Sequence, residues 1–382
     1  MMNDTHTTDS SPLLRSARNK VVIMYLLWDQ EPQQYLEDAI AGVVSQTYPK
    51  NAIEFLLVYN THRPEHVSAV PYIEETLAKH ADKLPHTTFL PQKENLGFSG
   101  GNNLGMQWAI DNGYDYVFLH NGDAYLGENC IEKMVDAMEA DKKIGASQPM
   151  ILLHPETDLV NTAGNAFHYL GFGYGNYYRW KKETVDVPAV ADVGYLSGAG
   201  TMLRTDLLKE YGLWDEDYFL YHEDTDYSLR LKMQQYRTVL IKDAEFFHKY
   251  QFSKSISKYF WMERNRYALL LLYYRIPTLL LLLPILVLLE LGLWLFAIKG
   301  GWAGEKKKVY QYWCKKEHWQ LWWNKRLKIQ KTRKITDREF LHNVARGIFF
   351  QEKETEHPLV LYVGNPVMEV YYWIVVRGLI WW

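Results

Sequence analysis

VVIMYLLWDQEPQQYLEDAIAGVVSQTYP, residues 21 to 49, sets the pattern that decides the fold. An apolar run, Val21–Leu27, is followed by a segment with helical spacing near residues 34–46. Short runs rich in Val, Leu, Ile and aromatic residues that alternate with helices indicate βαβ units. The alternation continues through the apolar runs Phe55–Val58, Thr88–Leu90 and Tyr116–Leu119 and through helical segments near 65–81 and 102–112. We therefore predict an α/β domain with a mainly parallel sheet flanked by helices.

The overall composition favours an intracellular protein that does not bind nucleic acid. The chain has 382 residues, a net charge of -3 and two cysteines without metal-type spacing. A reducing cytosolic compartment fits this usage. The polar residues 1–19 predict a disordered segment without a secretory leader. The charge is unevenly spread, because residues 299–346 contain 14 Lys or Arg and four acidic residues.

Residues 268–298 form a nearly uninterrupted apolar stretch, which is long enough to span a bilayer. Pro284 divides this stretch near its middle, and basic residues lie on both sides of it. Because basic flanks favour the cytoplasmic side, we predict a re-entrant or interface-lying helical pair that contacts membrane lipids. The alternatives are a single span and a buried helical hairpin. The Trp and Tyr residues interleaved with the Lys residues after 298 favour a membrane interface over a buried hairpin.

Polar residues follow three of the expected strands, where parallel sheets collect their reactive groups. They are Asp29, Asn60 and the triplet Asn121-Gly122-Asp123. Asp123 is placed to hold a divalent ion that bridges two phosphates, although a lone Asp after a strand is also a common turn former. The glycine-rich ENLGFSGGNNLG, residues 94–105, is typical of a nucleotide-diphosphate cradle or of an ordinary turn with an Asn helix cap.

HEDTDYSLRL, residues 222–231, places Glu223, Asp224 and Asp226 at the start of a predicted helix. The helix dipole and a cap account for one acid, but three this close repel each other unless a cation or a proton offsets them. The group therefore indicates an anionic site that serves a metal or an acceptor hydroxyl. His248, 24 residues after Asp224, is a candidate metal ligand, although a lone His is more often structural.

Taken in order, these segments resemble an inverting family 2 glycosyltransferase of the GT-A fold. The resemblance covers residues 20–250, and its most specific part is GYLSGAGTMLRTDLLKEYGLWDEDYFLYHEDTDYSLRLKMQQYR together with His248. The most similar branch is the rhamnosyltransferase and galactofuranosyltransferase-like group. MERNRYALLLLYY, residues 262–274, looks like the membrane-associated extension of bacterial members that act on lipid-linked acceptors.

The resemblance implies a metal-dependent transfer of a sugar from a dTDP- or UDP-linked donor to a lipid-linked or glycan acceptor. Asp123 and His248 would hold Mg²⁺ or Mn²⁺, and Asp224 would be the general base with Glu223 beside it. The floor between donor and acceptor would comprise Ser197, Gly198, Ala199, Gly200 and Trp214. The nucleotide sugar would contact Leu27, Asp29, Asn60, Asn95, Gly97, Phe98, Asn103, Asn121 and Gly122.

The expected organisation is a GT-A domain over residues 20–252, a hydrophobic membrane-associated segment over 253–300 and a basic, Trp-rich helical region over 301–382. Two alternatives remain: a catalytically weak membrane scaffold, and another nucleotide-sugar enzyme of the same fold. Nucleotidyl transfer is disfavoured because WDQEPQQ, residues 28–34, lacks a glycine-rich loop with Lys. A processive synthase is disfavoured because no Gln-x-x-Arg-Trp motif occurs. The protein is expected at the cytoplasmic face of the cell membrane, peripheral or single-span.

Overall fold

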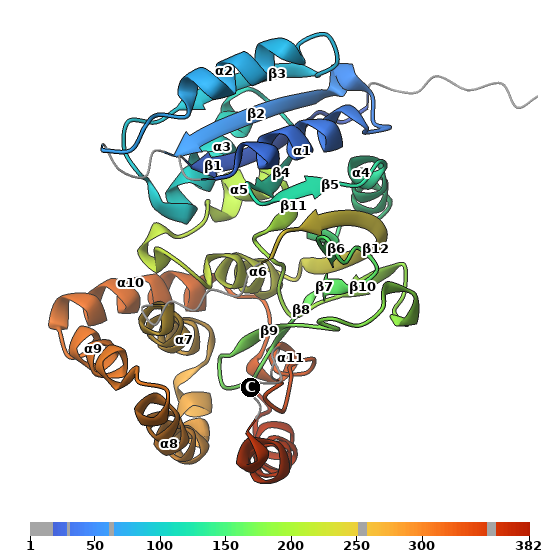
Figure 1. Cartoon of the computed structure of the whole chain (residues 1–382). Helices are drawn as coiled ribbons and strands as arrows, with labels where there is room; N and C mark the ends of the chain where they lie inside the picture. Colours follow the sequence, from blue (N-terminus) through green and yellow to red (C-terminus); the bar gives the residue numbers. More distant parts are fainter. Residues whose placement is uncertain (1–17, 29–30, 61–64, 251–257, 350–356) are drawn as a thin grey trace, which may run out of the picture.

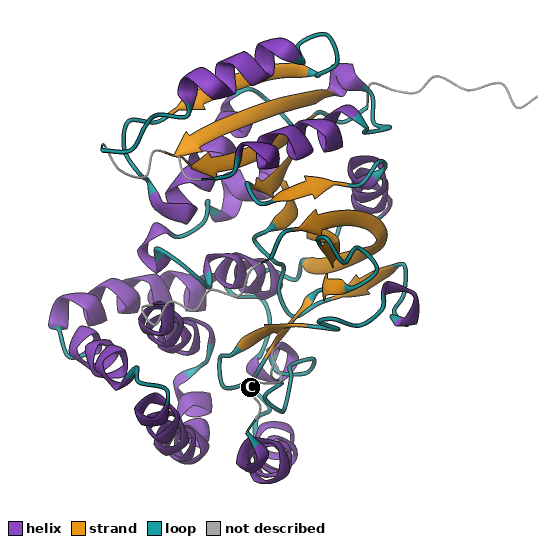
Figure 2. Cartoon of the chain, viewed as in Figure 1, coloured by secondary structure: helices purple, strands orange, loops and turns teal. Residues whose placement is uncertain are grey.

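A computed structural model describes residues 18–28, 31–60, 65–250, 258–349 and 357–382. The chain forms a sheet domain, at the top of Figure 1, and a group of helices from its last third, at the bottom. Figure 2 shows the same division, with the strands above and mostly helices below. The predicted disordered segment, apart from its last two residues, lies outside the described residues.

One ten-stranded mixed sheet forms the centre of the sheet domain, with the main order β10-β12-β6-β11-β4-β1-β2-β3. The strands β3, β2, β1 and β4 pair in parallel, which confirms the predicted parallel sheet for this half. The other half is mixed, because β11 runs antiparallel between β4 and β6 while β6 and β12 are parallel. The strands are β1 (Val21–Trp28), β2 (Ile53–Asn60), β3 (His86–Pro91), β4 (Tyr116–Asn121), β5 (Ala124–Leu126), β6 (Ile144–Leu153), β7 (Val160–Thr162), β10 (Val190–Asp192), β11 (Gly200–Arg204) and β12 (Arg237–His248), with a separate hairpin of β8 (Asn165–Phe167) and β9 (Gly173–Gly175).

Helices cover both faces of the sheet, so the central strands are apolar on both sides. In β1, Ile23 and Tyr25 pack into the core beneath α1 and α4, whereas Val22 and Met24 pack beneath α3 and α5. Strands buried on both faces read as continuous apolar runs, which is why the sequence revealed them. The helices of this domain are α1 (Gln33–Val44), α2 (Val70–Lys79), α3 (Gly97–Asp111), α4 (Cys130–Ala140), α5 (Thr205–Tyr211) and α6 (Glu223–Met233).

The last third of the chain is helical, and its apolar stretch is not divided where the sequence suggested. The chain breaks at Tyr274 and Arg275, between α7 and α8, whereas Pro284 lies inside α8. A proline removes one helical hydrogen bond, and here the helix continues through it. The described helices of this part are α7 (Lys258–Tyr273), α8 (Ile276–Lys299), α9 (Ala303–Trp313), α10 (Lys316–Thr332), α11 (Asp337–Phe340) and a C-terminal helix over 358–379 that contains α12 (Asn365–Tyr371).

The helix α8 is continuous, apolar and largely exposed. Its 24 residues reach a mean hydropathy of 2.6 in the most apolar window, of which 11% is buried. By length and composition α8 is the one helix in the described part of the chain that could cross a membrane.

A buried cluster of charges joins α7, α8 and α9. Glu263 and Arg266 of α7 pair with each other at 3.0 Å, and Lys306 of α9 bonds Glu263 at 2.7 Å. Glu290, from the middle of α8, pairs with Arg266 at 2.6 Å and with Lys306 at 2.7 Å. Burial alone would raise the pKa of Glu290, but these cations lower it to about 2. Since each buried charge has a partner, the cluster fixes the three helices in one arrangement.

Candidate active site

The ends of three parallel strands lie side by side at one edge of the sheet. The register pairs Trp28 with Asn60 and Leu26 with Asn121, so β1, β2 and β4 end together. Leu27, predicted to contact the nucleotide, lies at this edge. Ligands of open α/β sheets bind outside such an edge.

Asp123 and His248, far apart in the sequence, face each other at this edge. β5 starts directly after Asp123 and pairs with the end of β12, which places Ala124 opposite His248. His248 Nε2 lies 3.1 Å from Asp123 Oδ1, and His248 Nδ1 lies 3.0 Å from Asn161 Oδ1. Burial alone would raise the pKa of Asp123, but the His248 imidazole and nearby hydrogen-bond donors lower it below its ordinary value. The structure thus brings together the two predicted metal ligands.

This pair suits a divalent cation that is shared with a substrate. Nδ1 of His248 faces Asn161 Oδ1, which leaves Nε2 to face the Asp123 carboxylate. A protonated Nε2 donates a hydrogen bond to this carboxylate, and a cation that displaced that proton would have an imidazole nitrogen and a carboxylate oxygen as ligands. Within the described ranges, no group of three or more His, Cys, Asp or Glu could hold a metal. Further ligands would therefore come from substrate phosphates and water, as is usual for Mg²⁺.

Glu31, which sequence reasoning did not select, also lies at this edge. A Cβ atom at residue 122 would come 2.2 Å from the Glu31 carboxylate oxygens, so Gly122 leaves the space that this carboxylate fills. Burial and the Asp123 charge raise the pKa of Glu31 well above its ordinary value. The sequence does show Glu31 as an acid in the turn after β1. The prediction of a nucleotide contact went to Asp29 instead, because Asp29 is nearer the end of the strand. Asp29 lies outside the described residues.

The three acids of α6 have three different environments. Asp224 is partly exposed, and its carboxylate accepts from the Gly198 N–H at 2.9 Å and the Thr225 N–H at 2.6 Å. Glu223 is 4% exposed, and its Oε2 has no hydrogen-bond partner among the described atoms. Asp226 is structural, since it accepts from Arg230 at 2.8 Å and from the Tyr273 hydroxyl at 2.6 Å. Only Asp224 therefore presents an anchored carboxylate toward solvent.

The crowding changes the proton affinity of these acids. Burial raises the pKa of Glu223 well above its ordinary value, and the charge of Asp224 raises it further. Burial also raises the pKa of Asp224, although the Gly198 and Thr225 N–H groups oppose the shift. A carboxylate that is anchored, ionisable and more basic than usual is suited to accept a proton.

The predicted floor, Ser197–Gly200, connects Asp224 to the strand end that carries Asp123. Gly198 donates to Asp224, and the next carbonyl, that of Ala199, accepts from the Asn121 N–H at 3.0 Å. A Cβ atom at Gly198 would lie 3.3 Å from Trp214 and 3.4 Å from Phe98, so both predicted aromatic residues border the floor. The acid of α6 and the end of β4 thus lie on two sides of one short segment.

The asparagines of the predicted nucleotide cradle bond within the protein. Asn60 Nδ2 donates to Asn95 Oδ1 at 3.1 Å and to the Gly97 carbonyl at 3.0 Å, and Asn60 Oδ1 accepts from the Leu96 N–H at 2.8 Å. Asn103 donates to the Trp214 carbonyl at 2.9 Å and accepts from the Trp214 N–H at 3.0 Å. Asn60 therefore holds the turn before α3, while Asn103 holds the segment before α6.

The glycines of this cradle correct one expectation. They were expected to let the backbone approach a ligand, but residues 97–105 lie inside α3, which begins earlier than predicted. A Cβ atom at Gly101 would lie 2.8 Å from Leu26, and one at Gly105 would lie 2.3 Å from Met24. These two glycines let α3 pack closely on β1. Gly97, with φ +70°, remains at the helix start, where the ring of Phe219 lies 3.7 Å from its Cβ position.

The turn that precedes the acids is held by α7. Phe219, Tyr221 and His222 all have positive φ, between 62° and 73°, which is strained for residues with side chains. The buried Asn265 donates from Nδ2 to the carbonyls of Leu220 at 2.9 Å and Tyr221 at 2.7 Å, and also lies 3.1 Å from the Tyr218 carbonyl. The neighbouring Arg264 donates to the Tyr218 carbonyl at 2.8 Å. Both residues belong to MERNRYALLLLYY, which the sequence analysis matched to a membrane-associated extension without giving them a role at the site.

The chain belongs to the family described as glycosyl transferase family group 2, which matches residues 116–313. This match confirms the predicted family. An N-acetylglucosaminyl-diphospho-decaprenol L-rhamnosyltransferase of Mycobacterium tuberculosis is 29% identical over 186 residues, which are 44% of this chain and 60% of that protein. The same enzyme from a second strain matches equally. The chain therefore spans less than two thirds of the length of these curated relatives.

Three solved structures show a distant likeness. GalNAc-T7 with UDP, GalNAc and Mn²⁺ has a TM-score of 0.49 at 12% identity. The match covers 62% of this chain and 44% of the GalNAc-T7 chain. A mannosyltransferase from Pyrobaculum calidifontis, with GDP-Man and Mn²⁺, has a TM-score of 0.44 at 14% identity. The match covers 66% of this chain and 62% of the mannosyltransferase chain. Residues 1–349 of S. aureus TarS have a TM-score of 0.45 at 13% identity, and the match covers 94% of this chain and 90% of the TarS chain.

Proposed function

We propose that the protein is an inverting glycosyltransferase that moves a sugar from a nucleotide-diphosphate donor to a lipid-linked or glycan acceptor. Membership of the glycosyltransferase family gives the class of reaction. The observation that carries the proposal is the shared floor: Asp224 is hydrogen-bonded to Gly198, and the strand end leading to Asp123 is hydrogen-bonded to Ala199. A base and a diphosphate site on two sides of one segment are what such a transfer needs.

Asp224 acts as the general base. As the acceptor hydroxyl attacks the anomeric carbon, the Asp224 carboxylate takes its proton, and the bond to the donor diphosphate breaks on the opposite face of the sugar. One displacement inverts the configuration, so no protein nucleophile is required. Glu223, whose raised pKa keeps it protonated at neutral pH, adds no second negative charge beside the base.

Asp123 and His248 hold the divalent cation, Mg²⁺ or Mn²⁺. The bound cation would neutralise charge on the departing diphosphate. Asn161 fixes the tautomer of His248, and β5 fixes its distance from Asp123. The start of α3 at Gly97, held by Asn60, offers the positive end of the helix dipole to the donor, which we propose to be dTDP- or UDP-linked.

The acceptor is lipid-linked, and the enzyme works at the cytoplasmic face of the membrane. The mycobacterial relative is named for a decaprenol-linked substrate, and α8 supplies a long exposed apolar surface. In this assignment residues 20–252 form the transfer domain, 253–300 the membrane-associated segment and 301–382 the basic region that supports it.

Transfer assays with UDP-, dTDP- and GDP-sugars and Mn²⁺ or Mg²⁺ test the proposal. Asp224→Asn removes the base and should lower kcat by about 10² to 10⁴ while donor binding persists. The control Asp217→Asn changes a half-exposed acid that pairs with Lys325 and should retain activity. Wild-type turnover in Asp224→Asn would remove the base assignment. Donor binding without any turnover in the unaltered protein would support a binding scaffold instead.

A further inference from the structure

The side of the molecule at the bottom of Figure 1 presents two exposed apolar helix faces together. On α8 the exposed apolar residues recur every three or four positions, which places them along one face. These residues are Ile276, Leu280, Leu283, Val287, Leu288, Leu291, Leu295 and Ile298. The C-terminal helix repeats the pattern with Leu359, Tyr362, Val363, Val367, Val370, Trp373 and Ile374.

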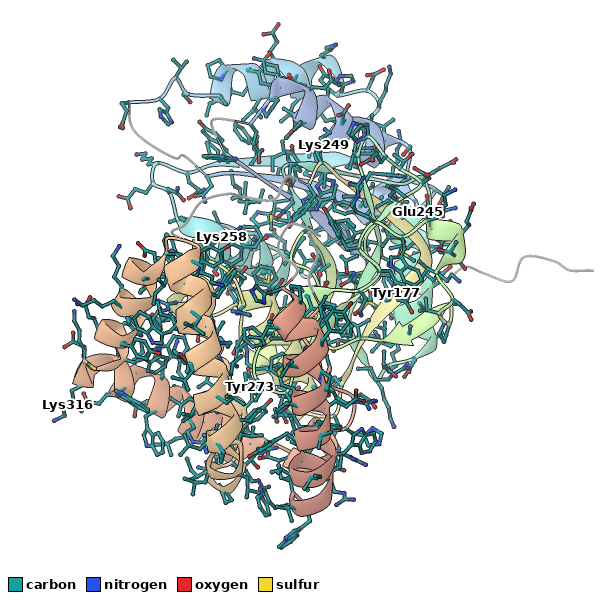
Figure 3. The ribbon with its side chains drawn as sticks, turned by 60° about the horizontal axis from the view of Figure 1, so that its bottom comes forward. Tyr177, Glu245, Lys249, Lys258, Tyr273 and Lys316 are labelled. Atoms are coloured by element: carbon teal, nitrogen blue, oxygen red, sulfur yellow. The ribbon has the colours of Figure 1, made fainter. Side chains whose placement is uncertain are left out.

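The two helices contact each other and run in opposite directions. The Trp382 indole donates to Thr278 at 2.9 Å near the start of α8, and the Tyr371 hydroxyl donates to the Leu281 carbonyl at 2.5 Å. Their buried faces meet in one apolar cluster with α7. Figure 1 shows both helices nearly end-on at the bottom, and Figure 3, which brings the bottom forward, shows them roughly parallel in front. Two adjoining helices with outward apolar faces define a plane.

Both ends and the middle of α8 are fixed to the rest of the protein. At its start, the Arg275 N–H and the Thr278 hydroxyl donate to Asp337. In the middle, Glu290 pairs with the buried charges of α7 and α9. After its end, the Trp302 ring stacks on Tyr259, in the first turn of α7, with the centroids 4.6 Å apart. Because α7 is in turn bonded to the sheet domain, α8 is held to the protein at its start, at its middle and just after its end.

This attachment excludes a simple crossing of the bilayer by α8. A spanning helix places its two ends on opposite sides of about 30 Å of hydrocarbon. Here the start of α8 is bonded to Asp337, and Trp302 after its end stacks on α7. A crossing would therefore draw the ion pairs of α7 and the adjoining sheet domain into the hydrocarbon. An orientation in the plane of the interface requires no such transfer.

The charges near these helices fit a lipid surface. Glu290 is the one acid of α8, and it is paired inside the protein. Exposed cations adjoin the apolar faces: Lys299 ends α8, and Lys307 and Lys308 lie on α9, which packs beside it. Exposed Trp373 adds an aromatic ring of the kind found at membrane–water interfaces. An apolar plane with cations beside it suits an anionic bilayer better than a soluble protein surface.

We infer that α8 and the C-terminal helix together form a monotopic docking surface that lies flat in the interface of an anionic lipid bilayer. The inference rests on the proposed function, since a lipid-linked acceptor gives this surface its purpose. It goes beyond that proposal by assigning the orientation of α8 and by adding the C-terminal helix to the contact.

Vesicle flotation of the full chain tests this surface without donor or acceptor. The vesicles are phosphatidylcholine alone or mixed with phosphatidylglycerol. The α8 variant Leu283→Asp/Leu291→Asp and the C-terminal variant Val370→Asp/Ile374→Asp should each weaken binding by at least about tenfold, because charges replace inserted apolar groups. The control Leu327→Asp, on α10 and 54% exposed, should bind as the unaltered protein does.

Three outcomes overturn the inference. Full binding by the C-terminal variant would show that this helix does not contact lipid. Resistance of the bound protein to alkaline carbonate extraction would show that α8 spans. Self-association in solution that both double variants abolish, without vesicle binding by the unaltered protein, would show that a second copy covers the surface. Transfer to a water-soluble acceptor, measured separately, decides the proposed function independently of all three.

Discussion

Replacing Asn265 by Ala should slow sugar transfer more than it weakens donor binding. The side chain is fully buried in α7 and bonds the turn that leads into Glu223 and Asp224. It touches neither the floor nor the predicted metal ligands in the contacts described above. Its expected effect is therefore on the position of the base alone.

The size of the effect follows from the hydrogen bonds. Asn265 Oδ1 accepts from Arg264 Nε at 2.7 Å, a bond within α7. Asn265 Nδ2 has two hydrogens and lies within 3.1 Å of three carbonyls of the turn, so the alanine variant also loses two good hydrogen bonds to the turn. At about 1 kcal/mol each, the loss is about 2 kcal/mol, and it leaves buried carbonyls without a donor. Residues with positive φ persist only where their surroundings hold them, so Tyr221 and His222 should relax. If all of this free energy is lost from the transition state, kcat falls about 30-fold.

Steady-state kinetics and thermal unfolding together separate positioning from stability. The matched control is Gln330→Ala, which removes a bond of 2.7 Å from α10 to the Leu272 carbonyl of α7 but touches no part of the acid turn. Both variants should lower the Tm by a few degrees. Only Asn265→Ala should lower kcat, with the KM for the donor nearly unchanged. Equal kcat losses in the two variants, or no loss in Asn265→Ala, would refute the positioning role.

Three further changes have defined outcomes. Glu290→Gln should lower the free energy of unfolding by about 3 kcal/mol at pH 7, since it leaves two buried cations, Arg266 and Lys306, with the single carboxylate of Glu263. Because the folded pKa of Glu290 is lowered, its stabilisation is complete above the ordinary value of 4.5 and is lost as the pH falls toward 2. Denaturant titration across that pH range checks this, and a pH-independent difference contradicts it. The control is Glu305→Gln, which removes an acid of α9 whose partner, Lys308, is exposed. Gly105→Ala should lower the free energy of unfolding by about 1 to 3 kcal/mol, because the added methyl group would clash with Met24. The control Gly304→Ala, whose methyl group would meet no neighbour, should leave stability unchanged. Equal melting temperatures of the two variants would contradict the packing role of Gly105. Asn161→Leu should weaken Mn²⁺ activation about 10- to 100-fold, measured by metal titration of the transfer rate, and an unchanged Mn²⁺ requirement would argue against His248 as a ligand.

The parallel half of the sheet could be predicted because both of its faces are buried. A strand covered on each side has no polar face, so Val21–Leu27 and Tyr116–Leu119 stand out as apolar runs. The antiparallel insertion of β11 could not be read in the same way, since pairing direction depends on contacts between distant segments. The break in the apolar region was misplaced for a related reason. Pro284 is tolerated inside α8, whereas the break at Tyr274 and Arg275 is held by Asp337, which lies far along the chain.

The candidate site was partly visible in the sequence. Asp123 and His248 could be paired only through a family pattern, because the β5–β12 register that joins them is a long-range contact. The three adjacent acids indicated a site, but their separate environments depend on Gly198 and Tyr273, which lie in other elements. Asn265 lies in the quoted stretch MERNRYALLLLYY, but its role could not be predicted, since its partners are carbonyls of a turn about 45 residues earlier in the chain.

The helix α7 links the lipid surface to the reaction. Two consecutive residues of α7 make the link: Asn265 bonds the turn before the acids, and Arg266 pairs with α8. Packed helices lie 8–10 Å apart, so two such layers would place the acids at most about 20 Å from the axis of α8. A sugar carried on a lipid diphosphate can reach that height while its lipid stays in the bilayer. On vesicles, the rate of transfer to a lipid-linked acceptor should therefore be higher for the unaltered protein than for Leu283→Asp/Leu291→Asp. The rate of transfer to a water-soluble acceptor should be the same for both proteins.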